Sequence, residues 1–284
     1  MKIAILSRFG HMECAGFLLE AFKEDNVTVY LDYHTDGYNW MTYYKKIYNN
    51  IEIIFNDFNS EIINKYDKIF KITSNDECLT HENIVSILHL NELKDKSKNF
   101  LSLSPYIFGE NITYTFPVFQ AEISTNKQKH VTLIGYFENK HADEDLNLFI
   151  EKNQEYTFNF IIWNDFDGNN FKKHNNVKVF KNLNTEQLTN IINSSKYILS
   201  KKHISYINFS GQLGLAMSFE VPLIVDSKTA SSYGLPGVLF DTCYDEIEKL
   251  ESISDEKYNK IIEDVKVFKE KNIEQNTKNI RDFI

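Results

Sequence analysis

The sequence predicts an α/β protein built from two Rossmann-like domains that face a cleft. Short apolar runs alternate with segments of helical periodicity along most of the chain, which is typical of parallel sheets with crossover helices. The alternation is interrupted once, at the polar stretch 122–129, and then starts again. The 284 residues are enough for two domains that each bury a core. We therefore expect an N-terminal domain at 1–122, a C-terminal domain at 130–254 and a helical tail at 255–284 that packs across both.

The first half of the chain opens with a βαβ unit and continues with the same alternation. Its apolar runs are short and bounded by polar residues, whereas its helices show apolar residues at helical spacing. Between Pro105 and Pro117 the pattern becomes irregular. The expected strands are 2–7, 27–31, 51–55, 68–73, 84–90 and 100–103, and the expected helices are 12–23, 38–48 and 59–64.

The second half repeats the alternation. Thr185 is expected to cap one helix, and Ser254 or Asp255 is expected to start the last one. The apolar run at 213–219 is expected to be a buried helix that leads into a buried strand ending at Val225. The other expected strands are 131–136, 156–163, 177–180, 197–200 and 238–240, and the other expected helices are 143–152, 185–194, 244–250 and 255–284.

Composition and charge narrow the class of protein. The net charge of −9 disfavours a dedicated nucleic-acid binder, because phosphate contacts need clustered lysine and arginine. The cysteines lie far apart, lack metal-ligand spacing and cannot all pair, so a reducing compartment is expected: Cys14, Cys78 and Cys243. The first residues resemble a buried strand more than a secretory signal. We therefore expect a cytoplasmic protein.

The long apolar region at 204–225 has a membrane span as its alternative interpretation. A span is disfavoured because polar and helix-breaking residues interrupt the region. These residues are Asn208, Ser210, Gln212, Glu220 and Pro222. We therefore expect no transmembrane segment.

The most informative stretch is the turn NFSGQLG at 208–214, which runs directly into the apolar helix. Free N–H groups and the helix dipole favour an anion at such a turn, and glycine allows a phosphate to approach closely. Ser210, Gly211 and Gln212 are therefore candidate phosphate-binding residues. The alternative is that Ser210 is an ordinary helix cap.

Three segments of the second half carry a family resemblance. VTLIGYFENKHADEDLNLFIE at 131–151 gives a strand, a glycine, a loop with a basic residue and a helix. VKVFKNLNTEQLTNIINSSKYILS at 177–200 gives a strand, a loop, a helix and a strand. SGQLGLAMSFEVPLIVDS at 210–227 gives a small-residue turn, a helix and a buried strand introduced by proline. In this order they resemble the C-terminal, nucleotide-sugar-binding domain of GT-B glycosyltransferases, over about 131–240.

The resemblance implies a GT-B-like fold and a metal-independent glycosyltransferase without a cofactor. The donor would be a nucleotide-diphosphate sugar, and the acceptor would be a glycan, a protein or a small molecule. The diphosphate would lie at Ser210, Gly211 and Gln212, and Gly135, in the same domain, would also bind the donor. Lys140 matches, within one position, a family lysine that neutralises phosphate, and its alternative is a solvated loop residue.

The first domain would bind the acceptor. His11 follows the first strand and is a candidate general base on an acceptor hydroxyl, since the pKa of histidine lies near working pH. Its alternative is an exposed loop histidine. Arg8 could bind an anion or the acceptor, and Gly10 suits a tight turn in either interpretation.

The sequence also departs from the family pattern. Retaining members often carry two glutamates eight positions apart, and the alignment places Ile207 and Leu215 there. A non-catalytic GT-B-like binding protein and a sugar-nucleotide epimerase are therefore alternatives. Asp165 and Asp167 form a D-x-D, a pattern that holds a metal in GT-A enzymes. We interpret this pair as an ordinary turn.

Overall fold

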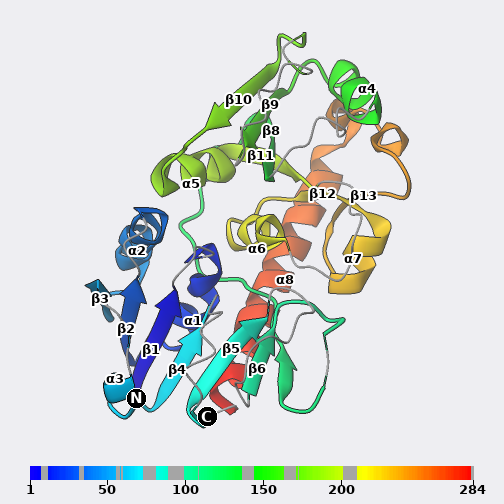
Figure 1. Ribbon diagram of the computed structural model, residues 1–284. Helices are drawn as coiled ribbons and strands as arrows, with labels where there is room; N and C mark the ends of the chain where they lie inside the picture. The colour runs from blue at the N-terminus through cyan, green and yellow to red at the C-terminus, as the bar shows by residue number, and fades with distance from the viewer. Residues whose placement is uncertain are drawn as a thin grey trace. The chain divides into compact units, whose positions relative to one another are not determined.

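The computed structural model describes residues 1–7, 12–31, 35–55, 58, 60–72, 81–88, 99–107, 109–135, 144–162, 171, 173–200 and 210–282. The chain divides into two compact units (Figure 1). The first comprises Met1–Ala121, Ser205–Gly214 and Lys269–Ile284, and the second comprises Glu122–Ile204 and Leu215–Phe268. The domain limits expected from the sequence, at 1–122 and 130–254, stay predictions.

The first unit contains a parallel sheet of strand order β3-β2-β1-β4-β5-β6-β7. Its strands are β1 Lys2–Ser7, β2 Asn26–Leu31, β3 Ile51–Phe55, β4 Lys68–Lys71, β5 Ile84–Leu88, β6 Asn99–Ser102 and β7 Ile112–Tyr114. Its helices are the 3₁₀ turn η1 Met12–Ala15, α1 Gly16–Ala21, α2 Thr35–Ile47 and α3 Ser60–Ile63. The sequence did not predict β7, because this three-residue edge strand is only half-buried and shows no apolar run.

The second unit contains a parallel sheet of strand order β10-β9-β8-β11-β12-β13. Its strands are β8 Gln128–Gly135, β9 Thr157–Ile162, β10 Val177–Lys181, β11 Ser195–Leu199, β12 Leu223–Asp226 and β13 Gly237–Phe240. The helices of this half are α4 Glu144–Lys152, α5 Thr185–Ser194, α6 Gly211–Ser218, α7 Ser227–Tyr233, the 3₁₀ turns η4 Tyr244–Glu246 and η5 Leu250–Ser252, and α8 Asp255–Asp282. The predicted α/β class with two Rossmann-like sheets is confirmed.

Local hydrogen bonds correct one prediction in this half, and one helix was not predicted. Asn184, rather than Thr185, caps α5: its Oδ1 accepts from the Gln187 N–H at 2.9 Å, and Gln187 Oε1 accepts from the Asn184 N–H at 3.1 Å. The sequence did not predict α7, because SKTASSY has no apolar periodicity. Asp226 caps it, and Gly234 ends it in the left-handed region at φ 69°.

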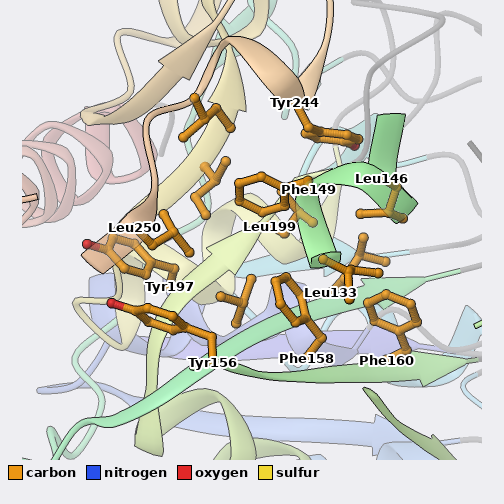
Figure 2. Packing of buried hydrophobic residues seen from close by; sticks show 14 of the residues in the cluster. Leu133, Leu146, Phe149, Tyr156, Phe158, Phe160, Tyr197, Leu199, Tyr244 and Leu250 are labelled. Carbon is orange, nitrogen blue, oxygen red and sulfur yellow. The ribbon is translucent and has the colours of Figure 1, made fainter. Parts of the chain in front are cut away.

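An aromatic cluster forms the core of the second unit (Figure 2). The Phe149 ring reaches from α4 to lie among Leu199, Phe158 and Tyr244. Its centroid is 5.9 Å from that of Phe158 and 6.0 Å from that of Tyr244. Burying one such side chain contributes about 1.5–3 kcal/mol. This packing fixes α4 and the η4 turn against the strands of the second sheet.

A buried carboxylate organises the first unit. Glu20, on α1, is 5% exposed, and its Oε2 accepts from the Tyr48 hydroxyl at 2.7 Å and from the Gln120 N–H at 3.1 Å. Lys23 Nζ donates to Glu20 Oε1 at 3.0 Å. Burial and the neighbouring Glu20 charge raise the pKa of Tyr48, so this phenol stays protonated and donates. The network joins α1 to the end of α2 and to the segment that leaves the unit.

The C-terminal helix α8 has residues in both units, with the change at Lys269. In its last turn, Arg281 Nε donates to the Ala21 carbonyl at 3.0 Å and Nη2 donates to Asp25 Oδ2 at 2.6 Å. The Met1 ammonium donates to Asp25 Oδ1 at 2.7 Å. Burial alone would raise the pKa of Asp25, but hydrogen bonds from these two cations hold it below its usual value.

Among the helices in the described ranges, none is long and apolar enough to span a membrane.

The Glu20 network gives a stability prediction. Tyr48→Phe removes one donor from a buried carboxylate and is expected to lower the free energy of unfolding by about 1–3 kcal/mol. Tyr106→Phe makes the same chemical change at a side chain that is 42% exposed, and should stay within about 0.5 kcal/mol of wild type. Urea titration measures both variants. Equal stabilities would show that the Tyr48 hydroxyl contributes nothing to the network.

The Asp25–Arg281 pair gives a pH-dependent prediction. Arg281→Met is expected to lower the free energy of unfolding at pH 7 by about 1 kcal/mol. The pKa of Asp25 is lower in the folded state than in the unfolded state. The pair therefore stabilises the fold fully above the unfolded-state pKa of about 4, and this stabilisation is lost as the pH falls through the folded-state pKa. The difference in free energy of unfolding between wild type and variant, measured by urea titration, should therefore decrease from pH 5 towards pH 2. The exposed Lys278→Met is the charge-matched control, and a pH-independent gap would contradict the assignment.

Candidate functional site

The second sheet reverses its strand order between β8 and β11, which are adjacent and parallel. In open α/β sheets, ligands bind outside the carboxyl ends of the strands at such a switch point. β8 ends there at Gly135, whose φ of 142° is a conformation that residues with a Cβ rarely adopt. The topology therefore brings the predicted Gly135 to the edge where a ligand is expected.

The helix α6 is the next described element after β11 in the chain. Ser210 precedes it and is half-buried, and the Ser210 carbonyl accepts from the Leu213 N–H at 3.0 Å. Gly211 is the first helical residue, and the Gln212 side chain is 6% exposed. The N–H groups of a first helical turn have no intrahelical acceptor, and the dipole is positive there. The predicted turn therefore begins a helix, and its role in binding an anion stays a prediction.

The structure adds a carboxylate to this turn. Glu13 and Gly211 both belong to the first unit, and a Cβ atom at Gly211 would lie 3.3 Å from Glu13 Oε1 and 3.5 Å from Glu13 Cγ. The Glu13 side chain thus packs against the backbone of the first residue of α6. Sequence reasoning missed Glu13, because only its place after the loop at 8–11 pointed to the site.

Aromatic packing fixes the backbone of Glu13. The hydroxyl of the fully buried Tyr44, on α2, donates to the Glu13 carbonyl at 2.9 Å. The Tyr44 ring stacks on Trp40 at 5.6 Å and meets Phe119 edge-on at 5.2 Å. Burial, with added repulsion from neighbouring groups, raises the pKa of Tyr44, so its hydroxyl stays a donor. η1 is therefore held at the end of the loop that carries the predicted acceptor residues.

Several predicted residues lie outside the described part of the chain, and their roles stay predictions. They are Arg8, Gly10, His11 and Lys140, together with the D-x-D residues Asp165 and Asp167. Of the two positions at which the family often has glutamates, Ile207 is also outside, whereas Leu215 is described. Leu215 is 5% exposed within α6, so an apolar side chain packs where an acid would stand.

Other chemistries find less support in the described residues. No group of three or more His, Cys, Asp or Glu side chains that could hold a metal ion occurs within them. Burial raises the pKa of the Cys14 thiol well above its usual value, and the Glu13 charge adds to this, so Cys14 is not an activated nucleophile.

A second pair of polar groups lies at the end of β12. Asp226 Oδ1 accepts from the Thr229 N–H at 2.8 Å and so caps α7. Asp226 Oδ2 and Thr229 Oγ1 are buried and have no hydrogen-bond partner among the residues that the structure places. This pair could accept and donate hydrogen bonds to hydroxyl groups. The sequence showed only an ordinary polar segment after a strand.

The sequence matches no protein-family model and no curated protein. The fold, however, is similar to those of solved structures. Anabaena Alr3699/HepE in complex with UDP and glucose has a TM-score of 0.61 at 13% identity, over 99% of this chain and 98% of that one. AviGT4, a glycosyltransferase of avilamycin A biosynthesis, has a TM-score of 0.59 at 8% identity, over 100% and 96%. The UDP-GlcNAc 2-epimerase of Neisseria meningitidis, bound to UDP-GlcNAc, has a TM-score of 0.50 at 10% identity, over 100% and 99%. The chain therefore has a GT-B glycosyltransferase-like fold.

Two glycines at the first position of a helix give a matched prediction. A Cβ at Gly16 would lie 2.5 Å from Phe119 Cδ1 and 2.9 Å from Tyr44 Oη, both in a packed cluster. Gly16→Ala is therefore expected to lower the free energy of unfolding by about 1–3 kcal/mol. Gly211→Ala meets only the flexible end of Glu13 and should cost less than about 1 kcal/mol. Urea titration measures the loss in free energy of unfolding for both variants. Equal losses would show that the aromatic cluster adapts to an added methyl group as easily as the Glu13 side chain does.

Proposed function

We propose that the protein is a glycosyltransferase that transfers a sugar from a nucleotide-diphosphate sugar to an acceptor hydroxyl. The observation that supports this most is the turn at Ser210–Gln212. It begins a helix that comes after β11 in the chain, and β11 lies at the switch point of a GT-B-like sheet. The likeness to HepE, which was solved with UDP and glucose, agrees with this choice of donor.

In this proposal the donor diphosphate binds at the start of α6. The N–H groups of Gly211 and Gln212 and the Ser210 hydroxyl would donate to phosphate oxygens. When the bond between the anomeric carbon and the diphosphate breaks, negative charge grows on the leaving oxygen. Preorganised donors and the helix dipole stabilise this charge, and Lys140 would neutralise part of it. These groups supply the positive charge, so the proposal requires no metal.

The acceptor would be bound by the first unit. Its hydroxyl oxygen forms the new bond to the anomeric carbon, and its proton passes to a base. We assign this role to His11, with Arg8 binding an anion or the acceptor and Gly10 giving a tight turn in the same loop. The Tyr44 and Gly16 packing fixes the segment that follows this loop in the chain.

Specific observations favour two alternatives. The likeness to the UDP-GlcNAc 2-epimerase suggests a sugar-nucleotide epimerase, which would change its substrate without an acceptor. Leu215, packed where retaining members often have a glutamate, suggests a non-catalytic binding protein. Incubation with a nucleotide sugar distinguishes them: an epimerase gives a new nucleotide sugar, a transferase needs an acceptor and releases the nucleoside diphosphate, and a binding protein gives no product.

Calorimetric binding of nucleotide sugars tests the proposal. Wild type is expected to bind at least one UDP- or GDP-linked sugar, and Ser210→Trp is expected to abolish this binding, because the indole fills the phosphate position. Ser231→Trp, on an exposed position of α7, is the size-matched control and should bind like wild type. If wild type binds none of these donors, the glycosyltransferase proposal fails. Unchanged affinity in Ser210→Trp would instead refute the phosphate position.

A further inference from the structure

We infer that Asp226 and Thr229 are specificity-determining residues that bind two neighbouring hydroxyl groups of the nucleotide-sugar donor. The inference rests on the proposed function, because it takes a nucleotide sugar as the ligand. Two observations lead to it. Both side chains are buried, and each has a polar atom that forms no hydrogen bond within the described ranges of the chain.

The pair lies on the edge of the second sheet where a ligand is expected. Asp226 is the last residue of β12, which pairs in parallel with β11 on one side and with β13 on the other. β11 also forms the switch point with β8. Because these strands are parallel, their carboxyl ends lie along one edge, and open α/β sheets bind ligands there. Asp226 is therefore one strand away from the switch point.

Capping of α7 explains only one of the two carboxyl oxygens of Asp226. Oδ1 accepts from the Thr229 N–H at 2.8 Å, which is the bond that a helix cap requires. Serine or threonine would supply this bond with a single oxygen. Oδ2 is buried as well and has no partner among the placed residues, and an unmet acceptor in the interior costs free energy. A ligand that donates to Oδ2 would remove this cost.

The Thr229 hydroxyl has the same property. The residue is 2% exposed, and Oγ1 is buried without a partner in the described structure, although valine would fill the same volume without this cost. Asp226 Oδ2 is two covalent bonds from Oδ1, and Thr229 Oγ1 is three from the amide nitrogen. Both atoms therefore lie close to the 2.8 Å hydrogen bond that joins the two residues, yet they do not bond to each other.

An acceptor next to a group that both donates and accepts is complementary to two adjacent hydroxyls on one ring. Nucleotide sugars carry such pairs on the ribose and on the hexose. A site built to bind a hydroxyl discriminates strongly against an analogue that lacks it, because the groups of the site are then left unpaired. Asp226 and Thr229 therefore select a donor with an intact hydroxyl pair over its deoxy analogue.

Binding in the absence of acceptor tests the inference. Thr229→Val keeps the shape of the side chain without its hydroxyl, and Asp226→Asn keeps a capping oxygen but replaces Oδ2 by an amide that only donates. Calorimetry measures the dissociation constant of the UDP- or GDP-linked hexose that wild type binds most tightly, and each variant should weaken binding at least about tenfold. Thr157→Val, at the start of β9 and so at the opposite edge of the sheet, is the matched control and should bind like wild type.

Stability separates a ligand-binding hydroxyl from a structural one. Thr229→Val removes an unpartnered buried hydroxyl, so its midpoint of urea unfolding without ligand should equal or exceed that of wild type. A lower midpoint would show that the hydroxyl acts within the fold, and the inference would be wrong. Wild-type affinity in Thr229→Val would overturn it as well.

Two analogues of the same donor identify the ring that is bound. One lacks the ribose 2′-hydroxyl, and the other lacks the hexose 3-hydroxyl, which belongs to each adjacent pair on that ring. For the analogue without the bound hydroxyl, wild type and Thr229→Val should agree within about twofold, because the interaction is already absent. A tenfold difference that persists with both analogues contradicts the inference. If wild type binds no UDP- or GDP-linked sugar, the proposed function itself fails, and the inference with it.

Discussion

Parallel pairing of every neighbouring strand is the constraint on which the rest of the structure depends. A parallel neighbour requires the chain to cross back over the sheet, so helices alternate with strands and the carboxyl ends collect along one edge. In the second sheet the crossover changes side between β8 and β11, which leaves an edge position with no connecting segment above it. Gly135 ends β8 there. The candidate site is thus a product of topology before it is a product of any side chain.

Side-chain packing then fixes the segments of the first unit that follow its first strand. Glu20 ties α1 to Tyr48 and to the Gln120 backbone, while Tyr44 ties α2 to the Glu13 carbonyl. Gly16 lies between these two ties and allows Phe119 to approach. A loop that follows a parallel strand is usually free to vary. Here the Glu13 carbonyl, in the segment directly after such a loop, accepts a hydrogen bond from the buried Tyr44 side chain.

Most of the fold could be predicted from the sequence because buried parallel strands are short apolar runs, and such runs stand out between polar segments. β7 and α7 could not be predicted, because neither segment has an apolar pattern of its own. For the site, Ser210 and Gly211 were visible as a small-residue turn before an apolar helix. Glu13 was not, because its significance comes from a tertiary approach to Gly211 that no local spacing encodes. Thr185 alone was expected to cap α5, whereas the reciprocal hydrogen bonds of the Gln187 side chain make Asn184 the cap.

The helix α8 has a consequence for how the chain acquires its structure. The first unit takes its last piece from residues after Lys269, where Arg281 contacts Ala21 and Asp25. Asn276 adds a hydrogen bond to the Phe116 carbonyl in the same unit. During synthesis the residues up to Ala121 therefore emerge without their C-terminal partner and wait for the whole second unit to be made. The part of the protein that is translated first is completed last, so a nascent chain arrested before α8 would expose the surface around Phe22 and Phe116 that this helix covers.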